Sequence, residues 1–490
     1  MQAARGELAQ LVIRGPQRTS LAKQQERIAA LEAQIEKLED DLSRRHLEFR
    51  AQSQPITTAA IQGAIPAAAT LIEFFVYRPF QAQTFPSQSF AAPRYAAYVL
   101  HHTGTAQAVV LGEVSAIDEA VKKLRQALSD PRRQDVKALA RKVDQLVMNP
   151  LRAALGATRQ LLLSPDGALN LVPFAALVDE QNQYLVSRYS ISYLTSGRDL
   201  LRLQTPLPSK QEAVIVANPA FGPVPNNALL AQRGFGLKSD VTAGKKPAGK
   251  DATKDANVSR AQLYFPPLPG TASEAQALRA LLPQATLLTN ADATKAALKQ
   301  LRGPRLLHIA THGFFLENVN SAAGNARGFG LPVGQSPAAA TASNPTGAEA
   351  LSPLLRSGLA LAGANATEQD GVLTALEAAG LDLWGTRLVV LSACDTGVGE
   401  VRRGEGVYGL RRALVLAGAE SQVMSLWPVS DTGTRDLMIA YYQGLQRNEG
   451  RGEALRQVQL RMLKMKGRQH PYFWASFIQS GEWANLAGKR

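Results

Sequence analysis

The sequence contains a single cysteine, Cys394, among 490 residues, so it cannot form a disulfide within one chain. A lone thiol is typical of a protein in a reducing compartment. No apolar run approaches the roughly 18 residues that a membrane-spanning helix needs. The opening residues, MQAARGELAQL, also lack the apolar stretch of a secretory signal. We therefore expect a soluble cytoplasmic protein with no membrane partner.

Acidic residues are the scarcer charge, with 40 Asp and Glu against 54 Lys and Arg, which gives a formal net charge of +14. A basic balance can indicate nucleic-acid binding. However, no RNP-type aromatic motif, zinc-finger spacing or recognition helix accompanies the basic residues, so we expect no nucleic-acid partner. The single cysteine and the lack of an HExxH motif argue against a metal site. The glycine-rich run 399–406 lacks the Lys-Ser/Thr of a phosphate-binding loop, and we expect no cofactor.

The first 53 residues form a predicted helical segment with an apolar seam. Its apolar residues are spaced by seven, three, four, three and four positions, which is the a/d pattern of a coiled coil. The seam residues are Leu21, Ile28, Leu31, Ile35, Leu38 and Leu42. A coiled coil predicts a homodimer or an activating protein partner bound through these helices. The alternatives are a helical hairpin packed on its own chain and the remnant of a helical-repeat array.

From residue 54 onward, short apolar strands alternate with amphipathic helices, a pattern that predicts parallel β-α-β units and the α/β class. Residues 238–260 are rich in Lys, Ala, Gly and Asp and are expected to be a linker. They divide two α/β regions, 54–257 and 258–490. In the second region, Thr271 and Glu274 have the spacing of a capping box at a helix start. Residues 317–350 are expected to be a surface loop.

Two predicted strands end in reactive side chains. The strand RLLHIA runs into Thr311-His312-Gly313, and the strand RLVVLSA runs into Cys394-Asp395-Thr396-Gly397. Ligands bind at the carboxyl ends of the strands in open α/β sheets. If the two strands are neighbours, His312 and Cys394 come within reach of each other.

A thiol and an imidazole at one sheet edge suit nucleophilic acyl chemistry. The thiolate attacks an acyl carbon, and the imidazole accepts the thiol proton and returns it to the leaving amine. The backbone N–H groups of Gly313 and Cys394 are candidate donors to the oxyanion. The alternative is that Cys394 is a small buried apolar residue. Asp395 opposes the catalytic interpretation, because a neighbouring carboxylate disfavours a thiolate.

A second histidine, His308, has the same strand parity as His312 and is expected to face the same side. We predict that it is a buried structural imidazole beside the site rather than a catalytic group.

In the segments around His312 and Cys394, and in two segments that follow Cys394, the sequence resembles the CHAT family. This family comprises caspase-like peptidase domains often found after TPR repeats. The matching text is LLHIATHGFF (306–315), RLVVLSACDTGVGE (387–400), GEGVYGLRRALVLAGAESQVMSLWPVSDTGT (404–434) and HPYFWASFIQSGEW (470–483). The resemblance implies a caspase-like, mostly parallel sheet flanked by helices. It assigns His312 and Cys394 as the catalytic pair, with the oxyanion held by the N–H groups of Gly313 and Cys394. By analogy with separase-like relatives, region 54–257 is expected to be an inactive caspase-like half and region 258–490 the catalytic domain.

The resemblance also implies a function, a cysteine endopeptidase that cleaves a protein substrate and stays latent until it is activated. The residue two positions before the nucleophile, which often lines the specificity pocket in such enzymes, is Ser392. Asp395 and Asp431 are the nearest acidic candidates for that pocket, although Asp431 is equally well placed to cap a helix. The alternative function is a catalytically silent scaffold that binds other proteins.

Overall fold

The structure is a computed structural model, and it describes residues 7–8, 26–31, 33–34, 56–81, 90–223, 264–315, 353–366, 370–392, 405–427 and 431–489. The expected linker 238–260, the expected loop 317–350 and the residues Cys394 and Asp395 lie outside the described residues. Within the described ranges, no helix combines the length and apolar character needed to cross a bilayer.

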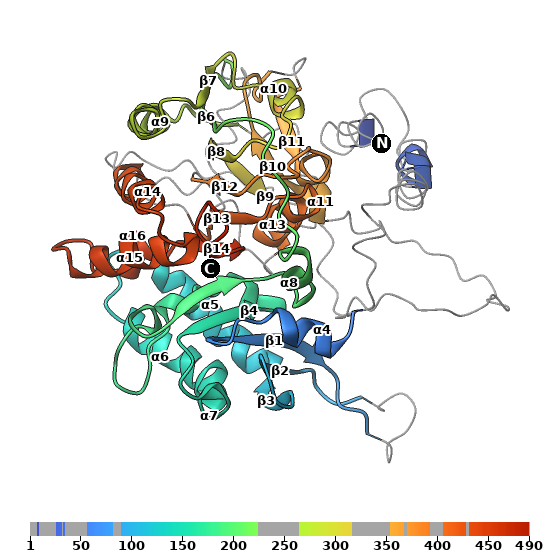
Figure 1. Cartoon of the computed structure of the whole chain (residues 1–490), viewed down its shortest axis with the longest axis vertical. Coiled ribbons are helices and arrows are strands. Elements are labelled where there is room, and N and C mark those ends of the chain that lie inside the picture. The colour runs from blue at the N-terminus through green and yellow to red at the C-terminus, as the bar shows by residue number, and fades with distance from the viewer. Residues whose placement is uncertain are drawn as a thin grey trace, which may run out of the picture.

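One large sheet runs through the molecule, and a small sheet packs beside it (Figure 1). The strands are β1 (Ala69–Tyr77), β2 (Arg94–His101), β3 (Gln107–Glu113), β4 (Gln160–Ser164), β5 (Ser190–Tyr193), β6 (Val214–Pro219), β7 (Thr286–Asn290), β8 (Leu306–Ala310), β9 (Gly313–Phe315), β10 (Ser357–Ala360), β11 (Val372–Thr374), β12 (Leu388–Leu391), β13 (Ser421–Ser425) and β14 (Phe477–Gly481). The large sheet has 11 strands in the order β3-β2-β1-β4-β5-β14-β13-β12-β8-β6-β7, and the small sheet has the order β11-β10-β9. In the large sheet, β1, β2 and β3 pair antiparallel, as do β13 and β14. The other neighbours in it are parallel. The mostly parallel sheet confirms the α/β class.

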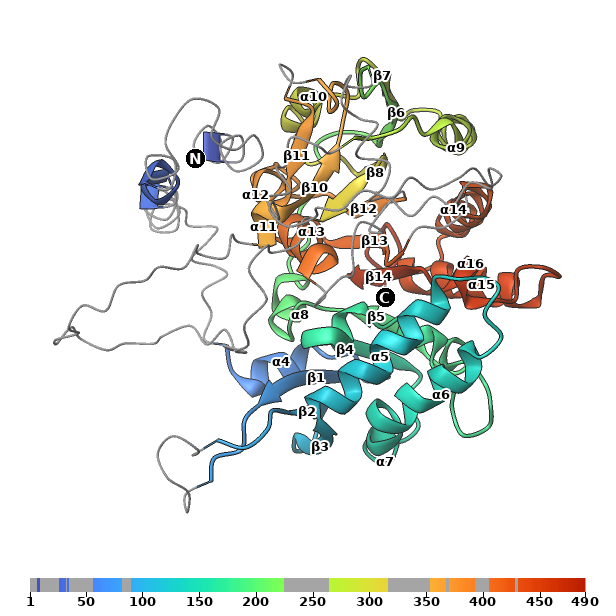
Figure 2. The same cartoon turned by 180° about the vertical axis from the view of Figure 1, so that it is seen from behind.

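Helices cover the sheet on both faces. They are α4 (Thr58–Ala64), α5 (Val114–Leu128), α6 (Val136–Val147), α7 (Arg152–Leu155), α8 (Arg198–Arg202), α9 (Pro269–Leu281), α10 (Lys295–Lys299), α11 (Pro353–Arg356), α12 (Ala375–Ala378), α13 (Glu405–Leu416), α14 (Asp431–Gln446), α15 (Arg451–Lys464) and α16 (Pro471–Trp474). Helices α9, α14 and α15 lie on one side of the strands β6, β8, β12 and β13, and α11, α12 and α13 lie on the other (Figures 1 and 2). Side chains of β8 and β12 are therefore covered from both sides.

The apolar composition of the central strands follows from this layering. All residues of β8 and of β12 are buried, as the near-continuous apolar runs predict for parallel strands between two helical layers. At the rim, α5 buries one face only, and its buried residues Ile117, Val121, Leu124 and Leu128 recur every three or four positions. Helix α13 ends before Gly418, whose φ of +105° lies in the left-handed region that favours glycine.

The start of α9 differs from its prediction. The helix begins at Pro269, so Thr271 lies inside the first turn and is not the N-cap. The Thr271 hydroxyl donates to the Leu268 carbonyl at 2.8 Å and accepts the Asn218 N–H at 3.0 Å. The capping-box prediction is therefore wrong. The signal for the true start is the proline, which is favoured in the first helical turn because it has no N–H to satisfy there.

The two sequence regions share one sheet. Strand β6 precedes residue 257, yet it lies between β8 and β7, strands of the second region. Strand β14 pairs with β5 and joins the two regions. The Trp474 ring packs edge-on against Tyr184, with centroids 5.2 Å apart, across the same junction. The division of the chain at residue 257 stays a prediction. Strand β6 precedes this position in the sequence but pairs with β7 and β8, which follow it.

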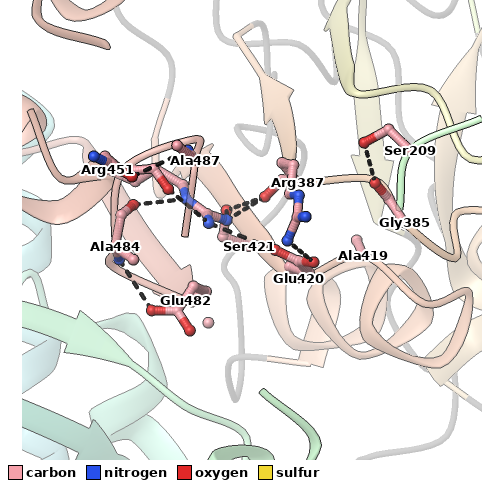
Figure 3. A network of polar contacts seen from close by, with 12 residues as sticks. Ser209, Gly385, Arg387, Ala419, Glu420, Ser421, Arg451, Glu482, Ala484 and Ala487 are labelled. Carbon is pink, nitrogen blue, oxygen red and sulfur yellow. Dashed lines mark hydrogen bonds and ion pairs between the residues drawn. The ribbon is translucent and has the colours of Figure 1, made fainter. Parts of the chain in front are cut away.

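A buried arginine, Arg451, forms several hydrogen bonds at the edge of the sheet where β12 and β13 begin (Figure 3). Arg451 is fully buried and donates to the Arg387 carbonyl at 2.5 Å, the Ser421 hydroxyl at 2.9 Å and the Ala484 carbonyl at 2.8 Å. Its guanidinium also lies 3.5 Å from a carboxylate oxygen of Glu420. Burial lowers the pKa of Arg451 from its ordinary value, and Glu420 and Glu482 act in the opposite direction. This network is structural, because it lies opposite the carboxyl ends of the strands.

The described part of the N-terminal segment packs on its own chain. Leu31 and Leu8 are each 1% exposed and form a cluster with Leu355 of α11, against which Ile28 and Leu376 pack. Ile28 and Leu31 belong to the predicted seam, and this contact matches the alternative of a segment packed on its own chain. The other seam residues, Leu21, Ile35, Leu38 and Leu42, lie outside the described residues, and dimerisation stays a prediction.

Changing Leu31 to aspartate is expected to release this segment from the rest of the chain. Loss of a buried leucine costs about 1.5–3 kcal/mol, which raises the released population at least about tenfold. Limited trypsin cleavage at Arg27 should accelerate accordingly, because cleavage follows the open population. The control is Ala33→Asp at an exposed position of the same segment. Equal cleavage rates for wild type and Leu31→Asp would contradict the packing.

Candidate active site

The carboxyl ends of β8 and β12 lie side by side. The strands are parallel, with Val390 opposite His308 and Leu391 opposite Ile309. The Ser392 N–H continues the ladder and donates to the Ile309 carbonyl at 3.0 Å. His312 follows β8 by two residues, and Cys394 follows Ser392 by two residues in the sequence. The expectation that these two strands are neighbours is confirmed, whereas the position of Cys394 lies outside the described residues.

The His312 imidazole is held between a carbonyl and two aromatic rings. The side chain is 5% exposed, and its Nε2 lies 2.8 Å from the Pro266 carbonyl oxygen. The ring centroids of Phe221 and Phe265 lie 5.3 and 5.8 Å from its own. A carbonyl only accepts, so Nε2 must carry the proton of this hydrogen bond. In the neutral imidazole, Nδ1 is then the nitrogen without a proton, the form that a general base requires.

The backbone around His312 is fixed by the small sheet. The Ala360 N–H donates to the His312 carbonyl at 2.9 Å, and the Thr311 hydroxyl donates to the Ala360 carbonyl at 2.5 Å. Gly313 is opposite Leu359 in the antiparallel ladder. Hydrogen-bonded and non-hydrogen-bonded pairs alternate in such a ladder. Because His312 and Ala360 are a bonded pair, Gly313 occupies a non-bonded position and its N–H points away from β10.

The three pocket candidates stand differently in the structure. Ser392 is 2% exposed, and its hydroxyl has no hydrogen-bond partner among the described residues. Asp431 is the first residue of α14, and its role as a helix cap stays a prediction. Asp395 lies outside the described residues. The structure therefore leaves the pocket as a prediction.

His308 is a structural imidazole, as predicted. It is fully buried, with Nδ1 3.0 Å from the Tyr442 hydroxyl of α14. Its Nε2 lies 3.2 Å from a Glu274 carboxylate oxygen, within ion-pair range but without hydrogen-bond alignment. Burial raises the pKa of Tyr442 well above its ordinary value, and Tyr441 and Glu274 add to that rise. Glu274 lies on α9 and Tyr442 on α14, so two helices hold this imidazole.

Sequence reasoning missed the residues that hold His312 in place, namely Phe221, Phe265 and Pro266. The available signal was the Pro266-Pro267 pair, because a residue before proline is restricted to extended conformations. Nothing in the sequence pattern points to its contact with His312, 46 residues away. Among the described residues, no group of three or more His, Cys, Asp or Glu side chains could hold a metal ion.

Comparisons with solved structures find distant likenesses. The Saccharomyces cerevisiae separase–securin complex matches with 10% identity and a TM-score of 0.37, covering 98% of this chain and 36% of that one. The Arg-specific cysteine proteinase gingipain R matches with 10% identity and a TM-score of 0.33, covering 76% of this chain and 74% of that one.

Comparisons with curated protein sequences find relatives of higher sequence identity. Tetratricopeptide repeat protein 28 of Homo sapiens is 26% identical over 376 residues, which cover 72% of this chain and 13% of the human protein. The Mus musculus protein of the same name is 26% identical over 375 residues, 14% of its length. The match thus spans a small part of those curated relatives. The family model of the CHAT domain matches residues 137–482, more than half of the chain, and this protein therefore belongs to the CHAT domain family.

Proposed function

We propose that this CHAT domain is a cysteine endopeptidase in which Cys394 is the nucleophile and His312 the general base. The observation that carries the proposal is the hydrogen bond from His312 Nε2 to the Pro266 carbonyl at 2.8 Å. That bond leaves Nδ1 as the nitrogen able to accept a proton. The parallel register of β8 and β12 supports it, because chain segments leaving neighbouring parallel strands emerge at one edge.

Each step of the reaction then has a group to perform it. His312 Nδ1 accepts the proton of the Cys394 thiol, and the sulfur attacks the peptide carbonyl carbon. The oxyanion accepts hydrogen bonds from the Gly313 N–H, which points away from β10, and from the Cys394 N–H. The protonated imidazole donates to the leaving amine, and a water that it deprotonates then releases the acyl group from the sulfur.

The substrate is a protein, and the pocket for the side chain before the cleaved bond involves Ser392, Asp395 and Asp431. An acidic pocket favours a basic side chain at that position of the substrate. The Ser392 hydroxyl is buried without a partner among the described residues, which suits a group that meets a ligand. The enzyme is latent until a protein partner activates it, and the curated relatives are proteins named for tetratricopeptide repeats. A free thiol nucleophile fits the reducing cytoplasm.

Region 54–257 is a non-catalytic half of the same architecture. The single cysteine of the chain is Cys394, so this region has no thiol to act as nucleophile. Ser164 is the last residue of β4 and lies opposite Glu73 of β1, and the Glu73 carboxylate accepts the Gly197 N–H. The backbone of Gly197 therefore occupies part of the sheet edge at which β4 ends, and Glu73 has a structural role there. Region 258–490 is the catalytic domain.

Exchange of the nucleophile tests the proposal. Cleavage of a random peptide library should be present in wild type and lost in Cys394→Ala, with a fall of at least about 10³-fold, since a nucleophile is indispensable to covalent catalysis. A thiol-reactive acylating probe should label wild type at Cys394. Equal turnover by the two proteins would refute the peptidase and leave the silent protein-binding scaffold as the better account.

A further inference from the structure

Asn365 joins two chain segments through an unusually complete set of contacts. It follows β10 in the turn 361–366 and is 8% exposed. Its Oδ1 accepts the Phe265 N–H at 2.9 Å, and its Nδ2 donates to the Phe265 carbonyl at 2.9 Å. One side chain thus satisfies both backbone groups of Phe265, as a neighbouring strand residue would. Because an N–H only donates and a carbonyl only accepts, this pairing fixes the orientation of the amide.

The backbone of Asn365 holds the second segment. Its N–H donates to the Phe221 carbonyl at 2.8 Å, and Nδ2 lies 3.5 Å from the Gly222 carbonyl, at the limit of a hydrogen bond. Phe221 follows β6, and Phe265 belongs to residues 264–268, which form no helix or strand. A single residue therefore ties two irregular segments to the turn after β10.

Those two segments are the ones that enclose the His312 ring. The rings of Phe221 and Phe265 pack against it, and Pro266, the residue after Phe265, supplies the carbonyl that accepts from Nε2. We propose that Asn365 is a positioning residue that sets the Pro266 carbonyl against His312 and thereby selects the imidazole tautomer whose Nδ1 serves Cys394. This inference deepens the proposed function and rests on it for the role of Nδ1.

The turn that carries Asn365 is rigid enough to act in this way. Its backbone N–H groups at Leu361, Ala362 and Gly363 donate to Gly371, Ala293 and Ala220 at 2.7, 2.9 and 2.9 Å. A Cβ on Gly371 would lie 2.2 Å from the Ala364 nitrogen, so the turn packs directly on a glycine. Among the described residues, no backbone N–H is bonded to the Pro266 carbonyl, and a displacement of about 1 Å would break its hydrogen bond to His312. The two bonds from the Asn365 amide fix the backbone of Phe265, the residue before Pro266, and add to the packing of the Phe265 ring against Phe314.

The first experiment reads the imidazole directly. Nitrogen-15 spectra of histidine-labelled protein should show the Nε2–H tautomer for His312, assigned by its disappearance in His312→Gln. In Asn365→Ala the Nε2–H signal should weaken and the Nδ1–H form should appear. Asn365→Asp keeps the acceptor for the Phe265 N–H and loses the donor to the Phe265 carbonyl, so an intermediate spectrum is expected. It also serves as the second variant should Asn365→Ala not fold.

The second experiment reads the thiol, which is the only one in the chain. The rate of Cys394 alkylation by iodoacetamide is measured against pH. The midpoint in Asn365→Ala should move toward the value of an ordinary cysteine, about 8.5. The rate at pH 6.5 should fall about tenfold, whereas the rates at high pH converge. The matched control is Asn485→Ala, since Asn485 is also 8% exposed and its Oδ1 accepts two backbone N–H groups, of Ala487 and Lys489.

The two experiments separate the inference from the proposed function. An unchanged His312 spectrum in folded Asn365→Ala or Asn365→Asp overturns the positioning role. A changed spectrum with wild-type Cys394 alkylated like an ordinary thiol supports the positioning role and counts against the peptidase. Loss of the low-pH reactivity in Asn485→Ala as well would mean that general destabilisation, and not the Asn365 contacts, moves the thiol, and would overturn the inference.

Discussion

Changing His312 to glutamine is expected to lower peptide turnover by about 10²- to 10⁴-fold, the usual contribution of a general acid–base group. Glutamine places an amide N–H near the position of Nε2, so it can still donate to the Pro266 carbonyl and fill the space between Phe221 and Phe265. It cannot accept the proton of a thiol at neutral pH. The loss should therefore appear in kcat, measured by single-turnover cleavage, with little change in melting temperature.

A second substitution and a control sharpen this test. His312→Ala removes both the proton transfer and the packing between the rings, and it should lower the melting temperature as well as kcat. His102→Ala, at an exposed position in region 54–257, should leave kcat unchanged. Turnover by His312→Gln within about threefold of wild type, well short of the loss that general acid–base catalysis implies, would exclude His312 as the base and would remove the main support for the peptidase.

The sequence could predict those parts of this site that leave a regular pattern of apolar residues along the chain. Strands β8 and β12 are all-apolar runs, and buried parallel strands leave that signal directly. His312 and Cys394 could be picked out because each follows such a run and precedes a glycine by one and three residues. The prediction that they lie close together rested on the assumption that the two strands are neighbours, and the parallel pairing of β12 with β8 confirms that assumption.

The residues that hold His312 could not be predicted, because contacts between single residues far apart in the chain produce no periodic pattern in the sequence. Asn365 pairs with Phe265 across 100 positions, and Pro266 meets His312 across 46. Each contact uses a backbone group of one partner, so the identity of that partner is only weakly constrained. The capping-box error at α9 has a related cause. Thr271 uses its hydroxyl for the tertiary contact to Asn218, and the helix start is set by Pro269.

Changing Arg451 to methionine is expected to lower the free energy of unfolding by about 3–5 kcal/mol, the usual cost of removing one partner of a buried ion pair. Methionine fills much of the volume but supplies none of the donors that now serve the Arg387 carbonyl, the Ser421 hydroxyl and the Ala484 carbonyl. It also leaves the nearly buried Glu420 carboxylate with less positive charge around it. Urea unfolding measures the change. Arg461→Met, at an exposed position of the same helix, should shift the free energy by no more than about 0.5 kcal/mol.

Lysine at position 451 distinguishes the charge from the geometry of the guanidinium. Arg451→Lys keeps a positive charge near Glu420 but lacks the planar fork that reaches several acceptors at once, so it should recover only part of the loss. Full recovery by lysine would mean that charge alone matters at this position. Because the network lies at the amino ends of β12 and β13, opposite His312, the destabilised variants should keep the His312 tautomer and the Cys394 alkylation profile at temperatures where they remain folded. A shifted alkylation profile in folded Arg451→Lys would show that the two edges of the sheet are coupled.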